Sequence, residues 1–297
     1  MSKPAKSGIS IAVPNKGRLS DAAVQLLGRA GLTIDTTATN ARQLFAMTWD
    51  GRVRVLFVRA IDIPELVQDG MADLGVTGLD LILETGKKVE TLMDLRFGKC
   101  RLVAAVPEKR GISTIADLPH HFTVATSFPN LTRRFFKKSK KDVKIVPVSG
   151  ATEVMPHIGV ADVITDLSAT GSTLAMNDLV EIASIQESTA QLIGNKRSIA
   201  DPAKKDLIEE VNFAIGSVVH ARGKRYLMAD VPTEKLRQVQ KILPGIAGPT
   251  VMDIFGRKEI KAVHVVVDEV DVYEAMRRLK EIGATGILVV PVDRMVK

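Results

Sequence analysis

Cysteine, aromatic residues and long apolar runs are all scarce in this chain of 297 residues. Cys100 is the only cysteine, which excludes an intramolecular disulfide and a cysteine-based metal site and favours a reducing, cytoplasmic setting. Aromatic residues make up only 4% of the sequence, so its cores must consist mainly of aliphatic side chains. No apolar run is long enough to cross a membrane, and the polar start, Met1 to Gly8, predicts no signal peptide.

Two nucleotide-binding motifs are also missing, the G-x-x-x-x-G-K-[ST] loop and the G-x-G-x-x-G fingerprint. Lysine and arginine number 41 against 34 acidic residues, which gives a net charge of +7 at pH 7. Apart from Arg133, Arg134 and the group from Lys137 to Lys141, these charges are dispersed, and no basic stripe alternates with aromatic residues. We therefore expect small phosphorylated ligands rather than nucleic acid.

The stretch from Ala161 to Leu174, A-D-V-I-T-D-L-S-A-T-G-S-T-L, predicts a buried strand, a loop of small hydroxyl residues and the start of a helix. Asp166 stands at the end of the strand, and the loop contains T-G-S-T from Thr170 to Thr173. Backbone N–H groups and hydroxyls in such a loop bind phosphate, and a carboxylate accepts hydrogen bonds from ribose hydroxyls. The pattern indicates a sugar-phosphate site, although such a run also serves simply as a turn and helix cap.

Two other segments favour the same kind of ligand and suggest a second lobe. The turn from Asn15 to Arg18 (N-K-G-R) follows a short apolar strand; it either holds a polyphosphate or lies in solvent. The segment from Ala72 to Gly78, A-D-L-G-V-T-G, echoes the stretch at Ala161 without being a strict repeat. Two strand-to-loop units of this type predict two α/β lobes with a cleft between them.

Helices are expected from Ser20 to Ala30, capped by Ser20, and from Leu131 to Lys138, capped by Asn130. A further helix is expected to carry Glu153. After Gly223 the order of predicted elements becomes β-α-β-β-α-β, which is typical of a ferredoxin-like domain.

Seven segments in order resemble the long form of ATP phosphoribosyltransferase, the first enzyme of histidine biosynthesis. The resemblance runs from about Ile9 to Val296. The segments are I-A-V-P-N-K-G-R-L-S (Ile11 to Ser20), A-D-L-G-V-T-G (Ala72 to Gly78), V-A-T-S-F-P-N-L (Val124 to Leu131), A-D-V-I-T-D-L-S-A-T-G-S-T-L (Ala161 to Leu174), Y-L-M-A-D-V-P (Tyr226 to Pro232), L-P-G-I-A-G-P-T (Leu243 to Thr250) and L-K-E-I-G-A-T-G-I-L-V (Leu279 to Val289).

This resemblance implies an α/β fold with a two-lobed catalytic core like a type II periplasmic binding protein, and a C-terminal ferredoxin-like (βαββαβ) regulatory domain. The expected bounds are residues 1–98 with 187–222 for lobe I, 99–186 for lobe II and 223–297 for a histidine-binding domain. The implied reaction joins N1 of ATP to C1 of phosphoribosyl pyrophosphate, with Mg²⁺, and releases pyrophosphate. The resemblance also implies inhibition by histidine and a homo-oligomer, either dimer or hexamer.

The implied transfer to N1 of ATP needs no catalytic triad, because the attacking ring nitrogen has its own lone pair. The five histidines are scattered, and no protein metal site is expected. By resemblance, Asp166, Glu153 and Arg18 are the catalytic candidates. Glu153 is included because the residue before Asp166 is Thr165, so a second carboxylate must come from elsewhere. The remaining residues implied by the resemblance are Ser168, Ala169, Thr170, Gly171, Ser172 and Thr173 with Asp166 for phosphoribosyl pyrophosphate, Lys16, Arg18, Asp73, Thr77 and Gly78 for ATP and polyphosphate, and Asp230, Thr250 and Gly286 for histidine.

Two other functions stay open at this point. A two-lobed binding or sensor protein without turnover has the same domain pattern, but the T-G-S-T loop after Asp166 and the missing export signal argue against it. A phosphoribosyltransferase that uses another base is the third interpretation. For Asp230, the alternative role is that of an acid near a helix start ahead of Pro232.

Overall fold

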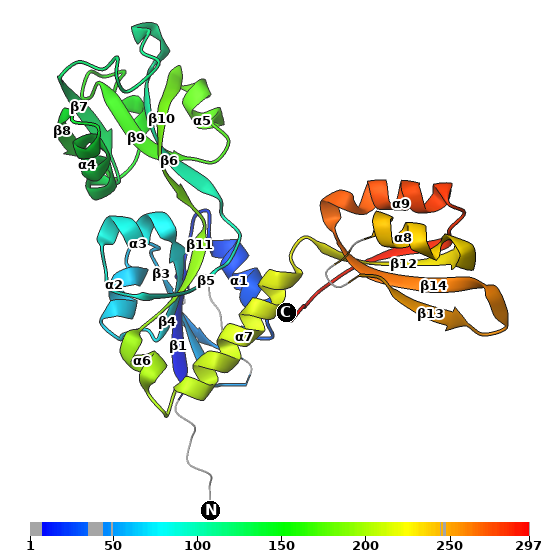
Figure 1. Cartoon of the computed structure of the whole chain (residues 1–297). Helices are drawn as coiled ribbons and strands as arrows, with labels where there is room; N and C mark the ends of the chain where they lie inside the picture. The colour runs from blue at the N-terminus through cyan, green and yellow to red at the C-terminus, as the bar shows by residue number, and fades with distance from the viewer. Residues whose placement is uncertain (1–7, 35–43, 49, 244, 246–247, 297) are drawn as a thin grey trace, which may run out of the picture. The chain divides into compact units, whose positions relative to one another are not determined.

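The computed structural model describes residues 8–34, 44–48, 50–243, 245 and 248–296. The chain divides into two compact units, Met1–Phe213 and Ala214–Lys297, and the division falls within helix α7 (Lys205–Ala221) (Figure 1). Residues 1–7 of the polar start and residues 244, 246 and 247 of the L-P-G-I-A-G-P-T segment lie outside the described residues. None of the helices in the described ranges has the length and apolar character needed to cross a membrane.

The first lobe is built on a six-stranded sheet with the order β2-β3-β1-β4-β11-β5. β1 pairs in parallel with β3 and β4, whereas β2 and β11 run antiparallel to their neighbours. β1 and β4 are buried along almost their whole length, which is typical of strands covered on both faces. The elements are β1 (Ile9–Pro14), α1 (Ser20–Arg29), β2 (Phe45–Met47), β3 (Val53–Val58), α2 (Ile63–Gln68), β4 (Leu74–Gly78), α3 (Leu79–Thr85), β5 (Glu90–Asp94), β11 (Ala190–Gly194) and α6 (Lys196–Ala200).

The second lobe is built on a five-stranded sheet with the order β10-β6-β9-β7-β8. β7 runs parallel to β8 and β9, and β6 runs antiparallel to β9 and β10. The elements are β6 (Cys100–Pro107), the 3-10 turn η1 (Glu108–Arg110), β7 (His121–Thr126), α4 (Pro129–Lys138), β8 (Asp142–Pro147), the 3-10 turn η2 (Thr152–Val154), β9 (Val163–Ser168), α5 (Ser172–Met176) and β10 (Leu179–Ser188).

The chain passes between the two sheets twice, from β5 to β6 and from β10 to β11. The crossings are neighbours because Ser188, at the end of β10, pairs with Cys100 at the start of β6. Helices also join the lobes, since Glu84 on α3 accepts hydrogen bonds from the N–H groups of Asn130 and Leu131 on α4, both at 2.8 Å. The two sheets and their two crossings confirm the predicted two-lobed, periplasmic-binding-protein-like α/β core.

Two predictions of helix caps are wrong. Ser20 is the first residue of α1, and the cap position is Leu19, which makes no side-chain capping bond. Asn130 lies inside α4 rather than before it, and the carboxylate of Glu84 accepts the first N–H groups in its place. The helix expected at Glu153 is present, as a 3-10 helix of three residues.

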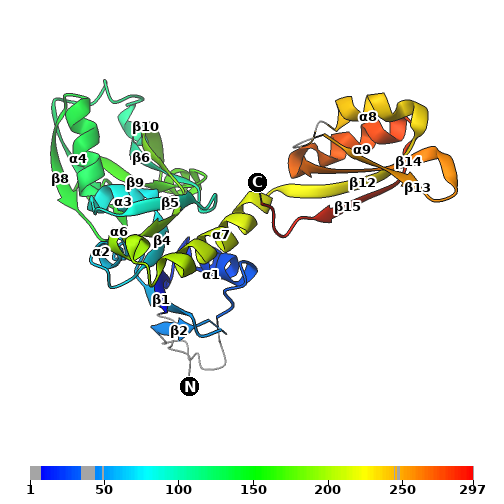
Figure 2. The same ribbon diagram turned by 60° about the horizontal axis from the view of Figure 1, so that its bottom comes forward.

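The C-terminal unit contains a four-stranded sheet with the order β13-β14-β12-β15. Figures 1 and 2 both show α8 and α9 on one face of this sheet. The chain order of strands and α-helices confirms the predicted βαββαβ pattern. The elements are β12 (Lys224–Pro232), the 3-10 turn η3 (Thr233–Lys235), α8 (Leu236–Ile242), β13 (Thr250–Ile254), β14 (Arg257–Asp268), the 3-10 turn η4 (Glu269–Asp271), α9 (Val272–Glu281) and β15 (Thr285–Pro291).

Candidate functional site

The loop after β9 lines a cavity of about 230 Å³ in the second lobe. β9 ends at Ser168 and α5 begins at Ser172, which confirms the predicted strand, loop and helix. Gly171 precedes the helix with a φ of 84°, a left-handed conformation that favours glycine. The lining includes Glu153, Asp166 and every loop residue from Ser168 to Thr173. The structure therefore brings together all the residues predicted for phosphoribosyl pyrophosphate.

Glu153 influences the carboxyl group of Asp166 in this cavity. Burial raises the pKa of the Asp166 carboxyl, and the negative charge of Glu153 acts in the same direction. Hydrogen bonds from the Leu167 N–H, at 2.7 Å, and from Thr152 act against this rise. Because the charge of Glu153 disfavours ionisation of Asp166, a cation or a set of hydroxyl donors bound beside Asp166 would stabilise its ionised form.

The residue before Asp166 points into the core. Thr165 is fully buried, and its hydroxyl lies 2.6 Å from those of Thr126 and Thr132. Since successive strand residues face opposite sides, an acid at position 165 would enter this buried hydroxyl cluster. A second carboxylate must reach Asp166 from another segment, and the turn that carries Glu153 is such a segment.

The turn from Asn15 to Arg18, called the cationic turn below, lies beside the A-D-L-G-V-T-G segment at one edge of the first sheet. Lys16 and Arg18 follow β1, Thr77 and Gly78 end β4, and these two strands are parallel. The carboxyl ends of parallel strands share an edge, where ligands of α/β proteins commonly bind. Lys16 is exposed, and the Arg18 side chain is 29% exposed. Thr77 is buried and donates its hydroxyl to the Ala60 carbonyl at 2.9 Å, so the two cations are the accessible charged groups of this set.

Asp73 lies at the opposite end of β4 from Gly78. Its carboxylate accepts hydrogen bonds from the Ser10 N–H and hydroxyl (2.8 and 3.0 Å), the Ser198 hydroxyl (2.6 Å) and the Lys204 ammonium (2.7 Å). Burial alone would raise the pKa of Asp73, but these bonds, led by the one from Lys204, lower it below its ordinary value. The structure thus does not bring Asp73 to the edge that carries the cationic turn.

Asp162 repeats the arrangement of Asp73 in the second lobe. It precedes β9 and accepts the N–H of Thr123, on the neighbouring parallel strand β7, at 2.9 Å. It also pairs with Arg110 at 2.8 Å. The A-D pair shared by the two segments therefore marks the start of a strand in both lobes, and the carboxylate fastens that strand to its parallel neighbour.

Two charged residues near the first-lobe edge were not predicted from the sequence. Asp80, in the first turn of α3, is only 1% exposed, and its Oδ1 lies 3.7 Å from Nη2 of Arg18. Arg59 directly follows β3, is 68% exposed and pairs with Asp62 at 2.8 Å. The sequence signal for Asp80 is an acid two positions after Gly78, and that for Arg59 is a charged residue directly after a strand. Both signals are weak unless the parallel pairing of the strands is known.

The three residues predicted for histidine binding come from three strands of the C-terminal sheet. Asp230 lies on β12 and Gly286 on β15, close enough that a Cβ built on Gly286 would lie 3.1 Å from Oδ2 of Asp230. Thr250 begins β13 and pairs with His264 of β14. By strand alternation they share the face opposite the buried residues Leu227 and Ala229.

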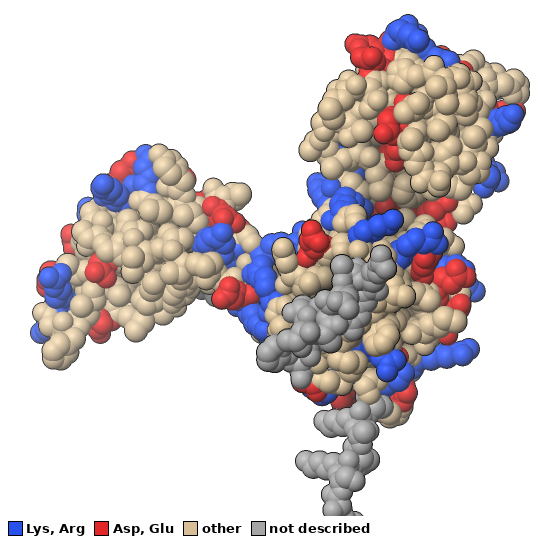
Figure 3. All heavy atoms as spheres, turned by 180° about the vertical axis from the view of Figure 1, so that it is seen from behind, with Lys and Arg blue, Asp and Glu red and all other residues tan. Residues whose placement is uncertain are grey.

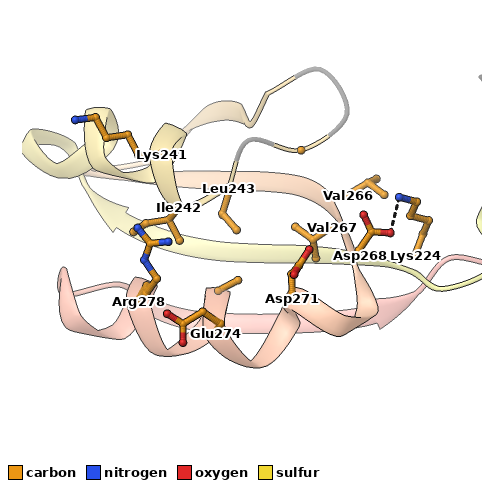
Figure 4. A pocket seen from close by; sticks show the side chains of 12 residues that line it. Lys224, Lys241, Ile242, Leu243, Val266, Val267, Asp268, Asp271, Glu274 and Arg278 are labelled. Atoms are coloured by element: carbon orange, nitrogen blue, oxygen red, sulfur yellow. Dashed lines mark hydrogen bonds and ion pairs between the residues drawn. The ribbon is translucent and has the colours of Figure 1, made fainter.

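A cavity of about 400 Å³ lies on the helix-covered side of the same sheet (Figure 4). Asp271, Glu274 and Arg278 line it, together with the ion pair of Lys224 and Asp268 at 2.6 Å. None of the three residues predicted for histidine lines this cavity.

On the face shown in Figure 3, acidic and basic side chains lie close to one another over the described surface of both units. This matches the dispersed charges of the sequence. Within the described ranges, no three His, Cys, Asp or Glu side chains gather in a way that could hold a metal ion. Any cation near Asp166 would therefore need ligands beyond the protein carboxylates.

Comparisons with known proteins identify the family. The sequence model of the ATP phosphoribosyltransferase family matches residues 59–216, and that of the HisG C-terminal domain family matches residues 221–294. The ATP phosphoribosyltransferases of Methanopyrus kandleri and Methanocaldococcus jannaschii are 47% and 45% identical to this chain, over 97% of it and 99% of their own length. A chain of the ATP phosphoribosyl transferase (HisG:HisZ) complex from Thermotoga maritima aligns with a TM-score of 0.60 and 27% identity, over 70% of this chain and 98% of that one. Two family models that together span most of the sequence, and relatives similar over nearly their full length, show that the chain belongs to the ATP phosphoribosyltransferase family.

Proposed function

We propose that the chain transfers the phosphoribosyl group of phosphoribosyl pyrophosphate to N1 of ATP and releases pyrophosphate, the first step of histidine biosynthesis. The observation that carries the proposal is the cavity after β9, in which a loop of N–H groups and hydroxyls adjoins the pair of Glu153 and Asp166. Membership of the family supports the same reaction.

The proposed mechanism needs no enzyme nucleophile. N1 of ATP attacks C1 of the ribose with its own lone pair, the bond between C1 and the pyrophosphate oxygen breaks, and its electron pair leaves with pyrophosphate. The loop from Ser168 to Thr173 binds the 5′-phosphate, and Asp166 accepts hydrogen bonds from the ribose hydroxyls. Lys16 and Arg18 bind the polyphosphate and stabilise the charge that develops on the leaving group, so catalysis rests on positioning and electrostatics.

The cavity has a donor set that suits Mg²⁺. This ion prefers oxygen ligands and commonly binds through one or two carboxylates, substrate phosphates and water. Glu153 and Asp166 provide two carboxylates in one cavity, and a cation bound there would offset the charge with which Glu153 raises the pKa of Asp166. Bound there, Mg²⁺ would neutralise part of the pyrophosphate charge.

The test is pyrophosphate release from ATP, phosphoribosyl pyrophosphate and Mg²⁺, compared with a panel of free nucleobases in place of ATP. Release with ATP alone supports the proposal; binding without release, or release only with another base, contradicts it. Asp166→Asn should raise KM for phosphoribosyl pyrophosphate about 10–100-fold, since a hydrogen bond to a charged group contributes about 1.5–3 kcal/mol. The matched control is Asp162→Asn, directly before the same strand, which removes a carboxylate outside the cavity and should leave that KM unchanged.

We further propose that this cytoplasmic enzyme forms a homo-oligomer and that histidine inhibits it through Asp230, Thr250 and Gly286. Asp230 would pair with the amino group of the ligand, while Thr250 and the Gly286 backbone would complete the contacts. Asp230→Ala should abolish inhibition and keep most of the activity. The control is Asp253→Ala, an exposed acid of the same sheet that pairs with Lys261. Equal inhibition of Asp230→Ala and the unmodified chain would refute the assignment.

A further inference from the structure

Asp80 is an almost fully buried carboxylate with only part of its hydrogen-bonding capacity used. Its Oδ1 accepts the Ser188 hydroxyl at 2.5 Å, and its own N–H donates to the same hydroxyl at 3.0 Å. Its Oδ2 is buried and has no hydrogen-bond partner within the described residues. Burying a charged group in this way is unfavourable unless a nearby cation or a functional requirement offsets it.

The cation beside it is Arg18. The Nη2 atom of Arg18 lies 3.7 Å from Oδ1 of Asp80, and the arginine side chain keeps 29% of its surface exposed. The contact joins one guanidinium nitrogen to one carboxylate oxygen and is longer than a hydrogen bond. Since a guanidinium has five N–H donors in a planar fork, this ion pair leaves donors for an anionic ligand.

Two glycines leave the space that the pair occupies. A Cβ on Gly78 would lie 2.0 Å from Oδ1 of Asp80. At Gly98, with a φ of 61°, a Cβ would lie 3.1 Å from Nη1 of Arg18 and 2.3 Å from a methyl carbon of Leu19. A side chain at Gly78 would collide with Asp80, and one at Gly98 would collide with Leu19 and press on Arg18, so four separate segments of the chain pack closely at this site.

Ser188 connects this pair to the crossings between the lobes. It is the last residue of β10 and pairs with Cys100, the first residue of β6. Arg18 follows β1 at the carboxyl edge of the first sheet. A hydroxyl on one crossing thus fixes the carboxylate that faces the arginine of the cationic turn.

We propose that Asp80, held by Ser188, is a positioning residue that orients the Arg18 guanidinium toward the pyrophosphate of the substrate. The inference rests on the proposed function, because the anion that Arg18 binds is the leaving group of that reaction. Asp80 does not touch the substrate and acts only through Arg18. Its carboxylate fixes a long, flexible side chain before the substrate binds, which is the kind of pre-organisation that limits misplacement of a reacting charge.

The test measures pyrophosphate affinity by calorimetric titration, in parallel with kcat and KM for phosphoribosyl pyrophosphate. Asp80→Asn should weaken pyrophosphate binding and lower kcat/KM by about 10–100-fold, the loss expected for a misplacement of about 1 Å. The melting temperature should stay level or rise, because the substitution removes a buried charge whose Oδ2 has no partner. Ser188→Ala should change affinity in the same direction and serves as the second variant if Asp80→Asn does not fold.

A double-mutant cycle separates positioning from a structural role. Asp80→Asn should weaken pyrophosphate binding about tenfold when Arg18 is present but less than about threefold in an Arg18→Lys background, because residues that act through one another are not additive. The control is Glu84→Gln, the other buried carboxylate of α3, which should lower the melting temperature and leave pyrophosphate affinity unchanged.

Each of three results would overturn the inference. An unchanged affinity in Asp80→Asn, an equal loss in both arginine backgrounds, or an equal loss in Glu84→Gln would each remove the positioning role. Failure of the proposed function is distinguishable, because the unmodified chain would then release no pyrophosphate from ATP and phosphoribosyl pyrophosphate.

Discussion

Replacing Asp73 by asparagine tests whether its carboxylate fastens the first sheet. The side chain is 5% exposed and accepts bonds from Lys204, Ser198 and Ser10 at 2.6–3.0 Å. Removing one partner of a buried ion pair destabilises a protein by about 3–5 kcal/mol. Lys204 is 30% exposed and can be rehydrated, and asparagine keeps one acceptor, so we expect a loss somewhat below this range, about 2–3 kcal/mol.

The assay is thermal unfolding of the full chain, followed by circular dichroism. A loss of about 2–3 kcal/mol corresponds to a fall in melting temperature of about 5–10 °C for a unit of this size. The matched control is Asp162→Asn, which removes the equivalent carboxylate of the second lobe. Asp162 and its partner Arg110 are each 35% exposed, so its loss should be about 1 kcal/mol or less.

The effect of pH gives an independent check on Asp73. Its pKa is lowered in the folded chain, so its contribution to stability is present above the unfolded value of about 3.9 and is lost as pH falls through the lower folded pKa. The difference in melting temperature between the unmodified chain and Asp73→Asn should therefore be full near pH 7 and shrink in strongly acidic solution. An unchanged melting temperature, with a large rise in KM for ATP, would refute the structural role and return Asp73 to the substrate site.

Two further substitutions test the packing around the site. Gly75→Ala should destabilise the first lobe by about 1–3 kcal/mol, because the added Cβ would lie 2.6 Å from Ile63 and 2.9 Å from Val67; an unchanged melting temperature would show that α2 can shift. Glu84→Gln should lower stability by about 1–3 kcal/mol, because one carboxylate oxygen that accepts an N–H group at the start of α4 is lost; susceptibility to limited proteolysis of α4 is the readout, and unchanged cleavage would contradict the capping role.

The sequence predicts those parts of the fold that depend on local patterns. The apolar V-R-V-L-F-V run forms β3, and T-G-S-T after an apolar strand gives the loop before α5. β5, with the sequence E-T-L-M-D, has no such pattern, because it exists through its pairing with β11, far along the chain. The cap of α4 by Glu84 and the contact of Asp80 with Ser188 likewise join distant segments, so no local signal predicts them.

The two A-D segments show why a correct architectural prediction can still misplace a residue. Asp73 and Asp162 play the same role at the start of their strands. If the two segments are aligned on these residues, Thr77 occupies the position equivalent to Asp166. The first lobe therefore has a buried threonine where the second has its acid. The predicted cations of the first-lobe edge, Lys16 and Arg18, come from the turn after β1, and Arg18 lies 3.7 Å from Asp80. Lobes built alike thus differ in charge: the cavity of the second contains the carboxylates of Glu153 and Asp166, and the turn after β1 of the first contains Lys16 and Arg18. In the proposed reaction the acids would bind the ribose hydroxyls or a cation and the bases would bind polyphosphate, so catalysis would rest on electrostatics.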